Sequence, residues 1–150
     1  MRIALYEPEI AGNVGAVLRL GACLGVAVDL IEPMGFAWDD ARVRRTAMDY
    51  IDHVEIVRHA GFAAFRESLG QSRLVLLTTK AEGSLYSFAF RADDVLLFGK
   101  ESAGVPATVA EVCDAKVRIP IRAEVRSMNL ALAAALALGE GLRQTGPLPI

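Results

Sequence analysis

Short apolar runs alternate with helical patterns along the whole chain. The apolar runs are nearly continuous, which is typical of strands that are covered on both faces in a parallel sheet. The predicted strands cover residues 3–6, 26–31, 54–57, 73–78, 95–98 and 117–119. The predicted helices cover residues 14–24, a short charged stretch from residue 39, and residues 62–69, 106–112 and 129–143. This alternation predicts an α/β fold with a mainly parallel sheet, in a single domain that spans residues 1–150.

Two residues give the expected starts of helices. Asn13 is a residue type that caps helices, and it precedes the apolar pattern over 14–24. Pro106 begins the predicted helix over 106–112, and proline is favoured as the first residue of a helix. We therefore expect one helix to begin after Asn13 and another at Pro106.

Composition excludes a disordered chain, whereas net charge gives only a weak indication of the partner. The chain has 150 residues, of which 53% are hydrophobic and 23% charged, so a disordered chain is excluded. The net charge of −2 gives no bulk electrostatic reason to bind nucleic acid. Arginine outnumbers lysine among the 16 basic residues, and its planar fork suits phosphate groups. The apolar excess favours a subunit interface.

The sequence predicts a soluble cytoplasmic protein without a metal ion. The apolar run at the N-terminus is too short for a signal peptide, and the longest one, residues 130–138, is too short to cross a bilayer. Cys23 and Cys113 lie in no metal-binding spacing, and His53 and His59 lack metal-binding neighbours. We therefore expect reduced thiols and neither a membrane nor a metal partner.

Three segments that follow predicted strands carry unusual residues. The first covers residues 7–15, and Arg19 lies four residues beyond Gly15, which places both on one helix face. The second, residues 99–106, has Glu101 between two glycines, and the third, residues 119–129, ends in polar side chains. In a parallel sheet such segments lie along one edge, where ligands bind.

The first segment also permits a different interpretation. A strand precedes Gly12 and Gly15, a helix follows them, and Glu32 lies 20 residues after Gly12. This is part of a dinucleotide-binding fingerprint, but the first pair of glycines in that fingerprint is missing. A small Rossmann-type NAD oxidoreductase is therefore the weaker alternative.

Taken in order, the three segments resemble the three motifs of the SPOUT RNA methyltransferases. The matching stretches are Asn13-x-Gly15-x-x-x-Arg19, Phe98-Gly99-x-Glu101-x-x-Gly104-Val105-Pro106, and Ile119-Pro120 followed by Ser127-Met128-Asn129-Leu130. A further stretch, Glu32-Pro33-Met34-Gly35-Phe36, resembles the small single-domain branch that modifies the tRNA wobble nucleotide.

The resemblance implies a reaction and a fold. S-adenosylmethionine would donate a methyl group to the ribose 2′-hydroxyl of cytidine or uridine 34 of tRNA, and the C-terminal part of the chain would form a deep trefoil knot. The matching cofactor contacts are Leu77, Gly99, Ile119 and Ser127. Glycine is expected at position 99 because a Cβ atom there would block the bent cofactor.

The residues that match the family's catalytic positions are Arg19, Glu101, Ser127 and Asn129. Because a guanidinium group stays protonated in proteins, Arg19 is expected to orient a phosphate and the hydroxyl rather than to act as a literal base. Glu101 could instead be a solvated acid of a loop. Ser127 and Asn129 could also simply cap the last helix.

The partners implied are tRNA and a second copy of the chain. Arg44, Arg45, Arg122 and Arg126 are the candidate contacts to phosphates of the anticodon stem-loop, although the first two also fit an ordinary charged helix face. The last helix is apolar on all sides, so the resemblance implies a homodimer through it and the helix over 14–24. A non-catalytic RNA-binding dimer with the same fold stays open as an alternative.

Overall fold

The computed structural model describes residues 1–146 and Leu148, except for the side chains of Thr46 and Ala47. Its six strands are β1 (Arg2–Tyr6), β2 (Ala27–Ile31), β3 (Ile56–His59), β4 (Leu74–Leu77), β5 (Val95–Phe98) and β6 (Ala115–Val117). Its α-helices are α1 (Ala11–Leu24), α2 (Asp40–Ala47), α3 (Phe62–Ser68), α4 (Ala107–Glu111) and α5 (Leu130–Thr145). Two 3-10 helices, η1 (Met48–His53) and η2 (Leu85–Ser87), complete the secondary structure.

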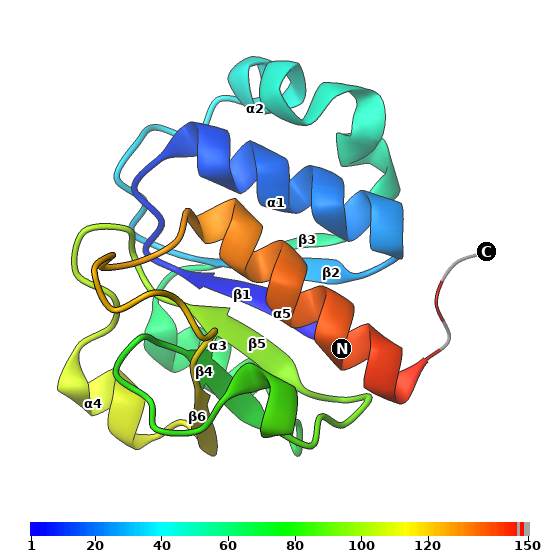
Figure 1. Ribbon diagram of the computed structural model, residues 1–150. Helices are drawn as coiled ribbons and strands as arrows, with labels where there is room; N and C mark the ends of the chain where they lie inside the picture. The colour runs from blue at the N-terminus through cyan, green and yellow to red at the C-terminus, as the bar shows by residue number, and fades with distance from the viewer. Residues whose placement is uncertain (147, 149–150) are drawn as a thin grey trace.

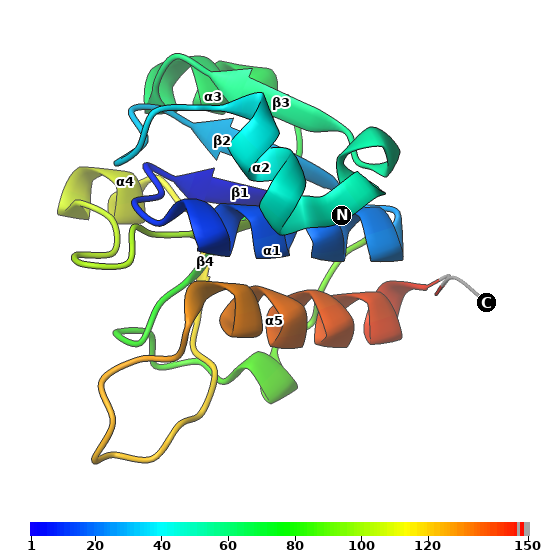
Figure 2. The same ribbon diagram turned by 90° about the horizontal axis from the view of Figure 1, so that it is seen from above.

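The strands form one parallel sheet in the order β3-β2-β1-β5-β4-β6. α1 and α5 lie side by side over one face, with α2 beyond α1, and α3 and α4 cover the other face (Figures 1 and 2). Alternate residues of each strand contribute to the two cores. In β1, Ile3 packs with Leu18 of α1, whereas Ala4 packs with Phe65 of α3. This double burial explains the continuous apolar runs and confirms the predicted α/β fold with a parallel sheet.

Four strands lie within one residue of their expected positions at each end, but β3 and β6 are each shifted by two residues. β3 begins at Ile56 because η1 and the turn after it occupy the chain up to Glu55, and it continues through the polar Arg58 and His59. β6 begins and ends two residues early, and Arg118 then leaves it to form an isolated bridge with Ser84.

His59 is buried between a polar cluster and the Phe65 ring, whose centre lies 5.3 Å from that of the imidazole. Its Nε2 lies 2.8 Å from Asp29 Oδ1. The same carboxylate accepts hydrogen bonds from Arg2 Nε at 2.8 Å and Nη2 at 3.0 Å. The cluster joins β1, β2 and β3 on the α3 side of the sheet, and the apolar pattern alone gave no indication of it.

Two helix starts differ from expectation. α1 begins at Ala11 with Ile10 as its N-cap, so the prediction that Asn13 caps this helix was wrong. α4 begins at Ala107, and Pro106 is its N-cap rather than its first helical residue. Asp39 is the N-cap of α2, because its Oδ1 accepts hydrogen bonds from the backbone N–H groups of Ala41 and Arg42. The short charged helix therefore starts where the sequence predicted it.

The chain returns from β6, at one edge of the sheet, to α5 beside α1, through a long segment that projects from the body of the molecule (Figure 2). Strand order agrees with the fold that the resemblance implies. The trefoil knot itself stays a prediction.

Candidate active site

The three segments singled out in the sequence follow β1, β5 and β6, and therefore meet at the edge formed by the carboxyl ends of the strands. The first two are held together by several bonds. Lys100 Nζ donates to Glu7 Oε2 at 2.8 Å, and Ser102 Oγ donates to Glu9 Oε1 at 2.5 Å. The hydrogen bond with Glu7 raises the pKa of Lys100, so this cation stays charged.

Glu101 joins the first segment to the second. Its carboxylate accepts the backbone N–H of Glu9 at 2.8 Å and the side-chain Nδ2 of Asn13 at 3.4 Å. Glu101 is half-buried. Its two oxygens are thus occupied by donors from the protein, and its place in the structure is that of a tie between loops rather than of a solvated acid.

Asn129 extends this chain of hydrogen bonds to the third segment. Its Oδ1 accepts the backbone N–H groups of Ala131 and Leu132, which makes it the N-cap of α5. Its Nδ2 donates to Asn13 Oδ1 at 3.0 Å. Asn129 therefore caps α5, as the sequence allowed, and also contacts Asn13, whereas its contact with a ligand stays a prediction.

These bonds have a fixed direction. The Oδ1 atom of Asn129 is occupied by the cap, so Asn129 can reach Asn13 only through its Nδ2 donor. Asn13 must therefore accept this hydrogen bond through its own Oδ1. Asn13 Nδ2 then points to Glu101, which must be an acceptor. We call this Glu101–Asn13–Asn129 chain the relay.

Asn13 was missed as a site residue in the sequence because it was interpreted as a helix cap. It lies in the first turn of α1, half-buried, and its amide contacts both other segments. The available signal was its place at the start of the first matching stretch, Asn13-x-Gly15-x-x-x-Arg19. The relay thus has a member from each of the three segments.

The structure gives a reason for Gly99 besides the expected room for the cofactor, which stays a prediction. A Cβ atom at position 99 would lie 2.5 Å from the backbone carbon of Gly104. The two glycines flank a tight turn in which Lys100 and Gly104 exchange backbone hydrogen bonds at 3.1 and 2.8 Å. The absent Cβ therefore makes room for the turn that presents Glu101.

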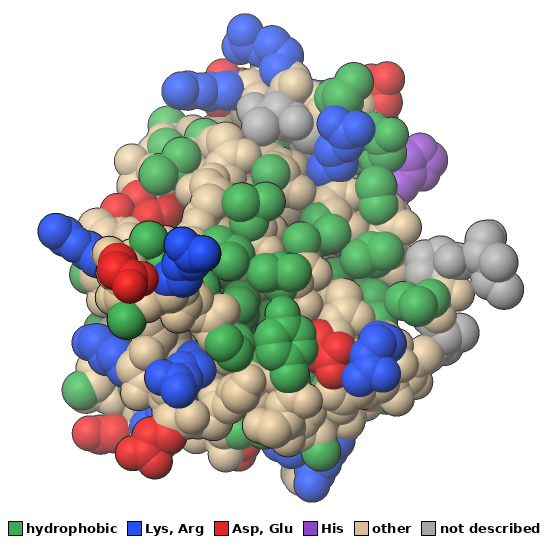
Figure 3. Space-filling model, in the orientation of Figure 1, with side chains coloured by type: hydrophobic (Ala, Val, Ile, Leu, Met, Phe, Trp, Pro, Cys, Tyr) green, Lys and Arg blue, Asp and Glu red, His purple; other side chains and the backbone are tan. Residues whose placement is uncertain are grey.

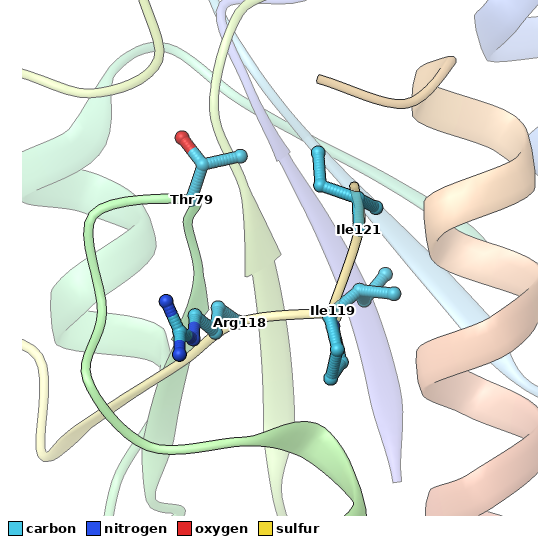
Figure 4. Close-up of a pocket in the computed structure, with 5 residues that line it drawn as sticks. Thr79, Arg118, Ile119 and Ile121 are labelled. Atoms are coloured by element: carbon cyan, nitrogen blue, oxygen red, sulfur yellow. The ribbon is translucent and has the colours of Figure 1, made fainter. Parts of the chain in front are cut away.

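Leu77, Gly99 and Ile119 lie near one another at the ends of three neighbouring strands. Leu77 is paired in register with Phe98, one residue before Gly99, and with Val117, two residues before Ile119. Beside them, a hollow is lined by Ile119 and Ile121 with Thr79, Arg118 and Pro120 (Figure 4). Arg118, which reaches this hollow, was not singled out from the sequence.

Arg19 is not part of the relay. It is exposed on α1, with Nη1 3.2 Å from Met48 Sδ and its guanidinium carbon 4.7 Å from the centre of the Tyr50 ring. Gly15, expected on the same helix face, is buried. Among the described residues, the contacts of Arg19 are thus with Met48 and Tyr50, and no hydrogen bond joins it to Glu101 or Asn129.

Ser127 and the candidate RNA contacts lie at the surface. Ser127, Arg122 and Arg126 are exposed in the projecting segment, which within the described residues makes only one internal backbone bond, from Val125 N to Arg122 O. Arg45 is exposed on α2, and Arg44 on the same helix pairs with Asp52 at 3.0 Å. The two groups of arginines are far apart in the sequence and lie on different elements.

Two kinds of feature are absent from the described residues. No group of three or more His, Cys, Asp or Glu side chains there could hold a metal ion. None of the helices formed by these residues is long and apolar enough to span a bilayer.

Known proteins share both the sequence and the fold. The chain is 53% identical over 148 residues to the tRNA (cytidine(34)-2′-O)-methyltransferase of Beijerinckia indica, covering 97% of this chain and 92% of the relative. A solved structure concerning 2-OH methylation of C/U34 on tRNA superimposes with a TM-score of 0.91 at 41% identity, over 95% and 94% of the two chains. An AdoMet-bound rRNA methyltransferase from Sinorhizobium meliloti gives a TM-score of 0.84 at 26% identity, over 95% of this chain and 55% of that one.

A family model also covers most of the chain. This model, described as the SpoU rRNA Methylase family, matches residues 1–139, which include the relay and Arg19. The chain therefore belongs to the SpoU rRNA Methylase family.

Proposed function

We propose that this chain transfers a methyl group from S-adenosylmethionine to the ribose 2′-hydroxyl of cytidine or uridine 34 in tRNA. The observation that carries this proposal is the relay, which ties the three family segments together beside the hollow at the sheet edge. The printed functions of relatives that match over nearly their full length support the tRNA wobble nucleotide as the acceptor.

The residues at the sheet edge suit the methyl donor. Ile119 and Ile121 give the hollow apolar walls that fit a purine, and the Arg118 guanidinium offers a partner for a carboxylate. Leu77 and Gly99 would hold the donor from the two neighbouring strand ends, with Ser127 from the projecting segment. When bound, S-adenosylmethionine supplies a methyl group on a positively charged sulfur, which is a good leaving group.

The chain's own residues then have two tasks, placement and charge stabilisation. The relay fixes the loops against one another, so Glu101 and Asn129 act as positioning residues. Arg19 is the catalytic residue: it orients an RNA phosphate and the 2′-hydroxyl and stabilises the oxygen as the proton leaves. The competing role, that of a literal base, would require a neutral arginine, whereas the guanidinium group stays protonated in proteins.

Because Arg19 lies apart from the relay, the site needs a second copy of the chain to be complete. The surface over α1 and α5 is largely apolar (Figure 3). Leu132 and Leu136 of α5 are 61% and 42% exposed, and Cys23 is exposed on α1. A homodimer through this face would bury these side chains and bring Arg19 of one subunit toward the other subunit's cofactor.

The dimer is tested by replacing Leu132 with glutamate. Leu132 is exposed, so the monomer should keep its fold, whereas a charge at the centre of the apolar face should block association. In sedimentation equilibrium, the wild-type chain should have about twice its 16.1 kDa mass, and Leu132→Glu should have the mass of a monomer. Val112→Glu, an exposed apolar position next to α4 on the opposite face of the sheet, is the control. A monomeric wild type or a dimeric Leu132→Glu variant contradicts the proposal.

The exposed arginines are the proposed contacts to RNA. Arg122 and Arg126 in the projecting segment and Arg45 on α2 have side chains exposed for contact with the backbone of an anticodon stem-loop, and Arg44 could exchange its Asp52 partner for a phosphate. Such contacts place the RNA without reading its sequence. A tRNA substrate would also locate the activity in the cytoplasm.

The function is tested with purified chain, S-adenosylmethionine and tRNA. Nucleosides from the digested product should contain 2′-O-methylcytidine or 2′-O-methyluridine from position 34, detected by mass spectrometry. Calorimetry should show binding of S-adenosylmethionine and not of NAD. Donor and tRNA binding without methylated product would instead support the non-catalytic RNA-binding dimer, and NAD binding would support the oxidoreductase.

A further inference from the structure

Arg19 is held by two uncharged side chains from one short stretch of the chain. Met48 Sδ accepts a hydrogen bond from its Nη1 at 3.2 Å, and the Tyr50 ring lies under its guanidinium group at 4.7 Å. Both residues belong to η1, directly after α2 ends. A thioether is a weak acceptor, and an aromatic face attracts a cation without neutralising it.

Other arginines of the chain are held differently. Arg2, Arg58 and Arg73 pair with the carboxylates of Asp29, Glu32 and Asp94. In those pairs an incoming anion would have to displace a carboxylate. The two contacts of Arg19 among the described residues leave its charge and its remaining N–H groups available to an anion.

The backbone at Met48 is unusual. Its φ of 56° and ψ of −148° lie in a region that residues other than glycine rarely adopt. Within the part of the chain that the structure describes, the other non-glycine residue with a positive φ is Glu7, which belongs to the first segment of the candidate active site. Strained residues of this kind persist where the surrounding structure enforces them, and they concentrate at functional sites.

We propose that Met48 and Tyr50 form an arginine socket, defined by these two side chains, that positions Arg19 for catalysis. The socket fixes the plane of the guanidinium group against the Tyr50 ring and keeps its charge unpaired for a phosphate of the RNA substrate. Met48 and Tyr50 act through Arg19, so both are positioning residues. This inference rests on the proposed function of Arg19 and extends it to a segment on which no catalytic role has been placed.

The test is the substitution Tyr50→Leu, which removes the ring. The single-turnover rate of methyl transfer should fall about tenfold, which corresponds to about 1.4 kcal/mol, with unchanged affinity for S-adenosylmethionine. Tyr50→Phe keeps the ring and should retain the wild-type rate. Tyr86→Leu, at an exposed tyrosine of η2, is the matched control and should also retain it. A wild-type rate for Tyr50→Leu, or an equal loss in Tyr50→Phe, overturns the proposal.

A double-mutant cycle separates positioning from general stability. In an Arg19→Ala background, Tyr50→Leu should cause no further loss of rate, because its effect passes through Arg19. Additive losses overturn the socket.

A readout without catalysis separates failure of the socket from failure of the proposed function. The Tyr50 ring should shift the NMR signals of the Arg19 side chain upfield, and Tyr50→Leu should abolish this shift. If the wild-type chain methylates no tRNA but the shift is present, the proposed function fails and the contact stands. If the shift is absent from an active enzyme, the socket fails alone.

Discussion

Replacing Arg19 with lysine is expected to reduce the single-turnover rate of methyl transfer about 100-fold, as is typical when a group that stabilises charge in the transition state is removed. Lysine keeps the positive charge, but it has no planar fork to hold a phosphate and a hydroxyl together and no flat face to stack on Tyr50. Because Arg19 is exposed, the melting temperature should change by less than about 2 °C.

The rate is measured with enzyme in excess over tRNA at saturating S-adenosylmethionine, so that product release does not contribute. Arg66→Lys is the matched control, because Arg66 is exposed on α3, on the face of the sheet away from α1. A rate within threefold of wild type in Arg19→Lys would show that charge alone suffices and would remove the oriented fork from the mechanism.

The layout of the fold was predictable because it depends on local patterns. The strand over Val95–Phe98 was predicted to the residue, since four consecutive apolar side chains are divided between two cores. β3 was misplaced because it ends in two polar residues: Arg58 pairs with Glu32, which follows the neighbouring strand, and His59 is hydrogen-bonded to Asp29 on that strand. A hydrophobic pattern cannot identify a strand whose polar residues are satisfied by partners distant in sequence.

The candidate site was predictable as a set of segments but not as a network. Glu101 and Asn129 were expected to belong to it, yet their common partner Asn13 is 88 residues from one and 116 from the other. Local spacing explained Asn13 equally well as a cap. Only the folded chain shows that Ile10 takes the cap position and leaves the Asn13 amide free for the relay.

Local spacing was also insufficient to predict the contacts of Arg19. Helical spacing correctly put Arg19 on α1 near the first segment, but the partners of its side chain come from η1, which no pattern in the sequence predicted. The role assigned to Tyr50 follows from its ring lying against the guanidinium group, a contact that joins residues 31 positions apart in the chain.

Because the hydrogen bonds of the relay have a fixed direction, replacing Glu101 with glutamine is expected to lower both stability and rate. Glu101→Gln removes one acceptor and introduces an NH2 group, which is a donor. If the new amide oxygen accepts from Glu9 N–H, the NH2 group faces Asn13 Nδ2, and two donors meet. Asn13 cannot turn over, because Asn129 already donates to its Oδ1 and is itself fixed by the cap of α5. We expect a loss of about 2 kcal/mol, and thus a melting temperature lower by about 4–8 °C, together with at least about tenfold slower methyl transfer.

Asn13→Asp should be harmful by itself, because it places a second carboxylate at the 3.4 Å position now occupied by the Nδ2 donor. Combined with Glu101→Gln, however, it should restore the relay. The carboxylate introduced at position 13 would accept from the amide introduced at position 101 on one oxygen and from Asn129 Nδ2 on the other. The amide oxygen at position 101 would keep the bond from Glu9 N–H, and the net charge of the double variant equals that of the wild type.

We therefore expect the double variant to be more stable than either single variant and to recover most of the methyl-transfer rate, measured by thermal unfolding and single-turnover assays. Additive losses would show that the three side chains are neighbours without a fixed direction of hydrogen bonding. Recovery of stability without recovery of rate would show that the relay holds the loops together but that the Glu101 carboxylate itself is needed for the reaction.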